Sequence, residues 1–380
     1  MTFTLTVEDR AILDTVSEFA AEEFAPHAVE WDQTKHFPVD VLRKAAAMGM
    51  GAVYVREDVG GSGLRRLDAV RIFERLAAGC PSMAAYLSIH NMVAWMIDTY
   101  GADEQRHQWL PKLATMEHLG SYCLTEPGAG SDAAALTTRA VRDGDDLVLT
   151  GVKQFISGAG SSDVYVVMAR TGGPGPAGIT AVIVPGDAEG LSFGANEQKM
   201  GWNAMPTRQV VLDGVRVPVA NVIGGFGNGF RIAMNGLNGG RLNIAACSLG
   251  GAQTALDRSL EYVAERSAFG APLSERETVQ HTVAEMRIQI EAARAFLWRA
   301  AEALDEDASD KIMLCAAAKR FVTETGYQVV DTALQLHGGY GYLTEYGIEK
   351  ILRDLRVHRI LEGTNEIMRM VVARSMIKSA

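Results

Sequence analysis

The sequence predicts a multidomain α+β fold with an N-terminal helical domain, a middle antiparallel β domain and a C-terminal four-helix-bundle domain. Three changes of pattern predict it. The first part of the chain repeats apolar side chains at helical spacing, and the middle part has short β-rich runs between Gly, Pro and Asp turns. Long helical patterns then return and continue to the end. The predicted domains are 1–118, 119–225 and 226–380.

The N-terminal domain opens with a helix. Thr6 followed by Asp9 resembles a helix cap, and apolar residues from Ile12 to Ala20 then fall on one face. Glycine-rich breaks separate the segments that follow. Further helices are expected around residues 38–48, 64–79, 83–99 and 103–116.

The middle domain is expected to be a small barrel or sandwich, and the last domain a bundle whose clearest helices are 274–304 and 308–335. The β-rich runs are 146–150, 163–168, 179–184 and 209–212. The stretch Gly225–Phe230 looks like a dinucleotide fingerprint, but Pro218 interrupts the run before it and no parallel strand is expected after it. The glycines therefore favour a linker that leads into a helix.

Composition excludes several classes of function. The formal net charge of −10, with no basic block, argues against nucleic acid as a partner. Apolar runs are shorter than a membrane span and no signal-peptide pattern opens the chain, so we expect no membrane span and a cytoplasmic protein. The cysteines are isolated, and no CxxC, HExxH or His/Cys cluster predicts a disulfide or a metal site.

Glu362 is a candidate general base, because it follows two aliphatic residues and precedes Gly363. A desolvated carboxylate beside a flexible backbone suits proton abstraction, whereas a solvated surface glutamate is the ordinary alternative. Glu366 is a rival one helical turn later, at an expected helix start.

Two glycine-containing segments could hold an anionic, ring-containing ligand. Tyr122–Asp132 has a Pro-Gly turn flanked by hydroxyls, and Phe155–Ser157 could cover a flat ring; a plain turn is the alternative. Gln335–Tyr342 ends a helical pattern with glycines, which also suits a helix C-cap. Arg266 and Phe269 could pair with a phosphate and a ring, or be a surface arginine beside a core phenylalanine.

Together these stretches resemble the acyl-CoA dehydrogenases along essentially the whole chain. CLTEPGAGSDAAA (123–135) and QLHGGYGYLTEYGIEKILRD (335–354) look like the two signature patterns of that family, and HRILEGTNE (358–366) looks like its catalytic segment. The resemblance implies a FAD-dependent, usually homotetrameric enzyme that oxidises acyl-CoA to 2-enoyl-CoA. It also implies electron-transfer flavoprotein as the electron acceptor.

The resemblance implies three groups of site residues. Glu362 is the base for the α-proton, since Gly240 stands where isovaleryl-CoA dehydrogenases carry theirs. The residues expected to bind FAD, partly from a neighbouring subunit, are Tyr122, Leu124, Thr125, Gly130, Ser131, Phe155, Ile156, Ser157, Arg266, Phe269, Arg276, Glu277, Gln335, Gly338, Gly339, Thr364, Asn365 and Glu366. The residues expected to bind acyl-CoA are Ser131, Asn238, Gly239, Gly240, Arg241, Leu361, Gly363 and Arg374. Relatives usually have glutamine at position 277, and Ser274–Glu277 reads as a capping box that accepts either residue.

Within the family, the resemblance is closest to members that act on isobutyryl-CoA in valine breakdown. It is carried by the stretches 88–98, 199–203, 236–244 and 359–363. Leu361 replaces a tyrosine common in straight-chain enzymes, which would leave room for a methyl branch. One methylene is worth only about 1–3 kcal/mol in such pockets, so 2-methylbutyryl-CoA or a short straight chain is an alternative substrate. A flavin oxidase or monooxygenase on the same fold is a more distant alternative.

Overall fold

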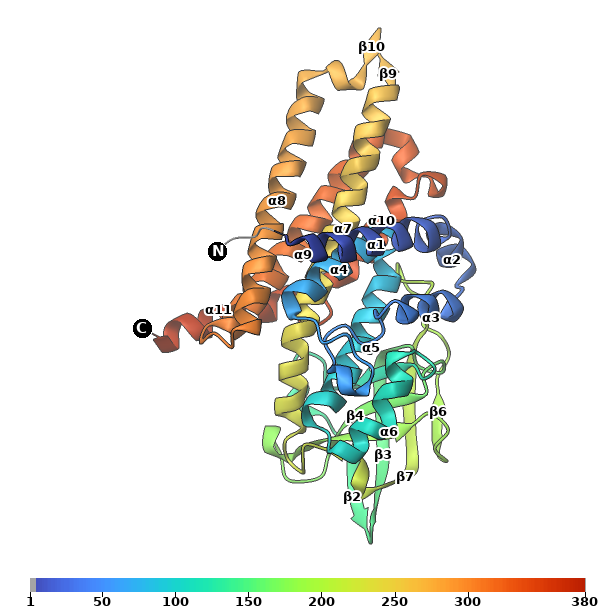
Figure 1. Ribbon diagram of the computed structural model, residues 1–380, viewed down its shortest axis with the longest axis vertical. Helices are drawn as coiled ribbons and strands as arrows, with labels where there is room; N and C mark the ends of the chain where they lie inside the picture. The colour runs from blue at the N-terminus through green and yellow to red at the C-terminus, as the bar shows by residue number, and fades with distance from the viewer. Residues whose placement is uncertain (1–4, 380) are drawn as a thin grey trace.

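The computed structural model describes residues 5–379. In Figure 1 the β domain lies at one end of the long axis, the tips of the longest helices lie at the other, and most of the N-terminal helices lie between them. The N-terminal helices are α1 Val7–Phe19, α2 Ala28–Thr34, α3 Val39–Ala47, α4 Arg66–Gly79, α5 Pro81–Tyr100 and α6 Asp103–Ala114. The predicted cap is confirmed, because Thr6 Oγ1 accepts from the Asp9 N–H at 3.0 Å and Asp9 Oδ2 accepts from the Thr6 N–H at 2.9 Å.

The middle domain is one bent sheet with strand order β6-β7-β3-β2-β4-β5-β8, and β1 pairs with β4. Its strands are β1 Gly120–Cys123, β2 Arg139–Asp143, β3 Asp146–Ser157, β4 Val164–Arg170, β5 Ile179–Pro185, β6 Leu191–Phe193, β7 Thr207–Pro218 and β8 Val222–Ile223. Most pairs are antiparallel, as predicted. Strand β4 departs from this, since it runs parallel to both β1 and β2.

Strand β4 is buried on both faces, which explains its uninterrupted apolar run. Val164, Val166 and Met168 pack in the cluster that includes α5 and α6, while Tyr165 and Val167 pack in the cluster inside the β domain. A strand covered on both sides needs apolar residues at every position rather than at alternate ones. The β domain is therefore fixed directly against the helical domain.

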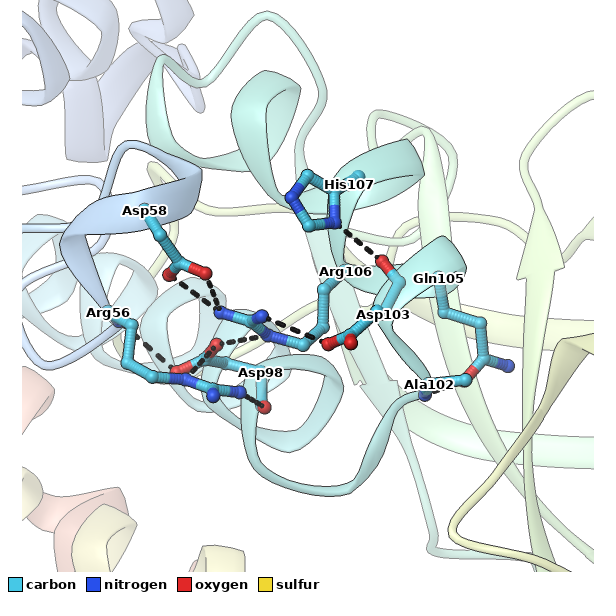
Figure 2. Close-up of polar contacts among 8 residues, drawn as sticks. All are labelled: Arg56, Asp58, Asp98, Ala102, Asp103, Gln105, Arg106 and His107. Carbon is cyan, nitrogen blue, oxygen red and sulfur yellow. Dashed lines mark hydrogen bonds and ion pairs between the residues drawn. The ribbon is translucent and has the colours of Figure 1, made fainter.

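An ion-pair cluster fixes the N-terminal domain at its contact with the sheet (Figure 2). Arg106, 3% exposed in its side chain, pairs with Asp98 at 2.9 Å and with Asp58 at 2.7 Å. Arg56 contacts the same oxygen of Asp98 at 3.0 Å. The cluster joins the turn Glu57–Val59, the end of α5 and the start of α6. From α6, the side chain of Gln105 donates to two carbonyls of the β domain, at 2.6 and 3.0 Å.

The C-terminal domain is built around α7, which has 37 residues, Gly229–Glu265. The other helices are α8 Glu277–Asp305, α9 Lys311–His337, α10 Ile348–His358 and α11 Asn365–Ser379. A small hairpin, β9 Ser267–Ala268 and β10 Ala271–Pro272, joins α7 to α8 at the far tip (Figure 1). No helix among residues 5–379 is both long and apolar enough to cross a membrane.

Two local predictions have opposite outcomes. The linker before α7 is confirmed: Gly224, Gly225 and Gly227 have positive φ, and only an antiparallel hairpin and helices follow in the described part of the chain. The capping box at Ser274–Glu277 is wrong, because α8 starts at Glu277 after a 3-10 turn and Arg276 is its N-cap without a side-chain hydrogen bond. The domain limits 1–118, 119–225 and 226–380 stay a prediction.

Candidate active site

Glu362 lies in the short loop between α10 and α11, and its carboxylate points at α7. The backbone is left-handed at Glu362, with φ of 57°, and at Gly363, with φ of 91°. A Cβ added to Gly240 would lie 2.6 Å from Glu362 Oε2, so the two groups are in direct contact. The residue is partly exposed as a whole, but Oε2 is buried and has no hydrogen-bond partner among the described residues.

Two cationic side chains hold the carbonyls of this loop. Arg241 Nε donates to the carbonyl oxygen of Glu362 at 3.0 Å. Lys319 Nζ donates to the carbonyl oxygen of Gly363 at 2.8 Å and to Asn365 Oδ1 at 3.0 Å. The loop is therefore attached to α7 on one side and to α9 on the other.

Burial dominates the electrostatics of the site. It raises the pKa of Glu362 to about 7, against the opposite effects of Arg241 and Lys319. Burial also lowers the pKa of Lys319 to about 7. A carboxyl group that titrates near neutral pH can both accept and release a proton there, which is what a general base requires.

Other aromatic and charged groups lie around the carboxylate. The Tyr122 hydroxyl is buried without a partner in the described chain, and burial followed by the charge of Glu362 raises its pKa well above the usual value. The Arg66 guanidinium lies 3.6 Å from the centre of the Tyr54 ring and 4.8 Å from that of Trp95. A Cβ on Gly239 would lie 2.5 Å from Arg66. Two aromatic rings and a guanidinium group thus lie beside α7 at Gly239, one residue before the glycine that Glu362 contacts.

The rival base Glu366 has a different environment. It is exposed in the first turn of α11 and pairs with Arg369 at 3.1 Å. Hydrogen bonding by its own backbone N–H lowers its pKa. Asn365 begins the same helix and is buried, and Thr364 precedes it and accepts from the Ile367 N–H. Arg374 is exposed further along α11.

The turn that contains Tyr122–Ser131 is anchored by a buried ion pair. Glu126 pairs with Lys153 at 2.8 Å and also accepts from the N–H groups of Thr137 and Thr138. The Gln154 N–H donates to the Thr125 carbonyl at 2.8 Å, so β3 holds the turn as well. Gly130 and Ser131 are exposed beside Leu124, which is buried.

Phe155, Ile156 and Ser157 follow on the same strand. Phe155 is 63% exposed and has φ of 59°, whereas Ile156 is buried. An exposed aromatic ring in a left-handed conformation, next to an anchored turn, suits contact with a flat ligand.

A second group of predicted cofactor residues lies elsewhere, at the tip of the helical domain (Figure 1). Arg266 follows Arg241 by 25 residues along α7, which corresponds to about 38 Å at the helical rise. Phe269 is 97% exposed, so the alternative expectation that it is a core residue is wrong. The predicted residues of this tip are Arg266, Phe269, Arg276, Glu277, Gln335, Gly338 and Gly339. No added Cβ on Gly338 or Gly339 would meet an atom within 4 Å, so this surface is open.

Sequence reasoning missed four residues of the site, namely Tyr54, Arg66, Trp95 and Lys319. Lys319 left a readable signal, because it interrupts the small and apolar run that starts at Cys315. A lysine on the buried face of a helix needs internal partners. Arg66 left no such signal, since it looks like any charged residue at a helix start.

Comparison with known proteins agrees with this arrangement. Family models described as acyl-CoA dehydrogenase N-terminal, middle and C-terminal domain match residues 6–117, 121–215 and 227–377. Isobutyryl-CoA dehydrogenase, mitochondrial, of Bos taurus is 52% identical over 374 residues, and that of Dictyostelium discoideum 50% over 375; each match covers 98% of this chain and 90% of the relative. The structure of butyryl-CoA dehydrogenase from Megasphaera elsdenii has a TM-score of 0.96 at 34% identity, covering 99% of this chain and 100% of that one.

Proposed function

Because this chain belongs to the acyl-CoA dehydrogenase family, we propose that it oxidises isobutyryl-CoA to methacrylyl-CoA with FAD, in valine breakdown, and that Glu362 is the base. The observation that carries the proposal is the contact between the buried Glu362 carboxylate and Gly240. A carboxylate held there, with a pKa of about 7, is suited to removing a proton from a substrate carbon.

The N–H of Glu362 is a second functional group in this proposal. It has no hydrogen-bond partner within residues 5–379, and it belongs to the same residue as the base. Donation to the thioester oxygen would stabilise the negative charge that develops when the α-proton leaves. The buried Tyr122 hydroxyl and the Tyr54 ring lie close enough to act on the charge of Glu362, and their burial would help to keep water away from it.

FAD would supply the acceptor for the β-hydrogen, which leaves as hydride. The residues near the turn 122–131 fit the ring of this cofactor, since Phe155 is exposed next to the residue that bonds to the turn, and a Cβ on Gly128 or Gly130 would meet no atom within 4 Å. The tip residues fit the phosphates and adenosine. Because about 38 Å of α7 separates Arg266 from Arg241, one FAD would need the tip of a second subunit. We propose that the cofactor sites are shared between subunits and, from the resemblance to the family, that the assembly is a homotetramer.

The substrate assignment is supported by the two relatives that are isobutyryl-CoA dehydrogenases and by Leu361. Leu361 is partly buried against the core next to the base. A leucine is shorter than a tyrosine, so it would leave space for a branch at the α-carbon. 2-Methylbutyryl-CoA or a short straight-chain acyl-CoA remains the second candidate, because such pockets separate neighbouring chain lengths weakly. Electron-transfer flavoprotein is the proposed acceptor of the electrons.

An anaerobic titration tests the proposal. The protein containing FAD is mixed with isobutyryl-, butyryl-, 2-methylbutyryl- or isovaleryl-CoA, and flavin absorbance is followed. We expect isobutyryl-CoA to bleach the flavin fastest, and the Glu362→Gln variant to bind FAD without bleaching. Faster bleaching by another thioester would transfer the assignment to that substrate. Absence of bleaching with all four would overturn the dehydrogenase function, and bleaching by the variant would overturn the role of Glu362.

A further inference from the structure

We propose that Lys319 is a positioning residue for the base, whose ammonium group holds the left-handed loop that directs the Glu362 carboxylate at Gly240. This inference rests on the proposed function, because it assumes that Glu362 removes the α-proton. Lys319 itself is buried on α9, and its hydrogen bonds are with the loop rather than with Gly240.

The contacts of Lys319 are unusual for a buried lysine. Its side chain is 0% exposed, and it donates to the Gly363 carbonyl and to Asn365 Oδ1. It forms no ion pair with a carboxylate in the part of the chain that the structure describes. An ammonium group buried without an ion pair costs several kcal/mol. The two hydrogen bonds to the loop are the contacts that offset this cost.

The loop needs external support. A left-handed conformation costs a residue with a side chain about 1–2 kcal/mol, and Glu362 adopts it directly before Gly363, which is also left-handed. Arg241 holds the carbonyl of Glu362, and Lys319 holds the next carbonyl. The two hydrogen bonds therefore hold the peptide groups on either side of Gly363. Without Lys319, the loop could relax and withdraw the carboxylate from Gly240.

The same side of α9 also fixes the ends of the loop. Asn365 accepts from Lys319 and donates to Glu324 at 3.1 Å, and Arg359 donates to Glu324 at 3.1 Å. The Asn365 N–H closes the loop onto the Arg359 carbonyl at 3.0 Å. Lys319 is the member of this network that reaches the residue directly after the base.

Charge gives Lys319 a second effect on the base. The titratable groups that act on Glu362 or are affected by it are Arg241 on α7, Lys319 on α9, Tyr122 at β1 and Tyr54 in the N-terminal domain. Both cations favour the ionised carboxylate, and Lys319 is the one whose pKa lies near 7. Removing it should therefore make Glu362 harder to ionise.

The test compares Lys319→Met, Lys319→Gln and the control Lys199→Met in protein loaded with FAD. Lys199 is a partly buried lysine, whereas Lys319 is fully buried; it donates to one carbonyl, that of Met205, and lies outside the loop. The measurements are the pH dependence of flavin reduction by isobutyryl-CoA, the thermal midpoint, and the 13C resonance of the Glu362 carboxyl, assigned with Glu362→Gln. The glutamine variant retains a hydrogen-bond donor. If the methionine variant does not fold, the glutamine variant is used to test whether Lys319 positions the base.

For Lys319→Met we expect the acid limb of the rate profile and the carboxyl titration to move up by about one pH unit. The rate at neutral pH should fall about tenfold, with KM changed less than about threefold. Lys199→Met should alter the thermal midpoint alone. An acid limb that stays in place while only the thermal midpoint falls would overturn the inference. Full activity of Glu362→Gln would instead overturn the proposed function, so the two failures are distinguishable.

Discussion

Glu362 Oε2 occupies the space that a side chain on Gly240 would need, since a Cβ there would lie 2.6 Å from that oxygen and 2.9 Å from the carboxyl carbon. The absence of a side chain at residue 240 is therefore a condition for the position of the base. For the same reason, residue 240 could not carry a carboxylate while the Glu362 carboxylate occupies this place.

Replacing Gly240 with alanine should lower the rate of flavin reduction without lowering the thermal stability. Gly240 lies inside α7, where alanine is favoured over glycine by about 1 kcal/mol, so the thermal midpoint should hold or rise unless the contact strains the helix. The carboxylate, however, must move, and a displacement of about 1 Å can cost about 100-fold in rate. Flavin reduction in a single turnover and thermal unfolding measure the two effects. A Gly240→Ala variant with the wild-type rate would show that the base does not act from this position.

The rate of flavin reduction should rise with pH through about 7. Glu362 accepts a proton only when it is ionised, and burial raises its pKa to about 7 from the ordinary value of 4.5. The stability linked to this group has the opposite sign: it is present below pH 4.5 and is lost as pH rises through about 7. Glu362→Gln should therefore stabilise the protein more at pH 8 than at pH 5. Equal effects at both pH values would contradict the raised pKa.

Much of the fold could be predicted from the sequence because its signals are local. The Thr6 cap depends on residues three positions apart, and the segments 103–116 and 308–335 repeat apolar residues on the faces that the structure buries. The Ser274–Glu277 pattern failed although it is equally local, since the hairpin β9–β10 and the 3-10 turn after it set where α8 can begin. Tertiary context overrode the cap there.

The site was harder to predict because its members come from distant segments. A motif identified Glu362, but the motif does not contain Lys319, Tyr54 or Arg66. Lys319 reaches the loop, and Arg66 and Tyr54 come close to α7, only after the helices have packed together. The parallel position of β4 beside β1 was missed for the same reason, since alternation along a strand does not reveal which strand becomes its neighbour.

The tip hairpin should contribute to FAD binding and not to the position of the base Glu362. Phe269 is 97% exposed in a left-handed turn, with the Arg276 guanidinium 5.9 Å from its ring. If a second subunit places its FAD there, Phe269→Ala should lower the amount of FAD retained after gel filtration by several-fold. The exposed Val141 on β2 provides a control, because Val141→Ala removes apolar surface away from the tip. Equal FAD retention by Phe269→Ala and the wild type would argue against a shared cofactor site.

The Lys153–Glu126 pair should be essential for the turn that it anchors. Both side chains are buried, at 0% and 4% exposure. Burial opposes ionisation of Glu126, but Lys153 and the hydrogen bonds lower its pKa to about 2. The linked stability is thus present above pH 4.5 and is lost as pH falls toward 2.

Lys153→Met would leave that carboxylate buried and unpaired, which costs about 3–5 kcal/mol. We expect a lower free energy of unfolding in urea together with weaker FAD binding. The double variant Glu126→Gln/Lys153→Met should recover part of the stability, because neither charge then remains. A double variant as unstable as the sum of both single variants would mean that the pair does not interact energetically.

The cluster in Figure 2 allows a matched comparison of two aspartates that contact the same arginine. Asp98 is 5% exposed and lies 2.9 Å from Arg106, whereas Asp103 is 83% exposed and lies 3.4 Å from it. Asp98→Asn removes a buried charge from a buried guanidinium and should cost about 3 kcal/mol. Asp103→Asn should change stability by less than about 0.5 kcal/mol, because water screens that pair. Urea unfolding of both variants measures the difference, and equal losses would mean that proximity to Arg106, rather than burial, sets the strength of these contacts.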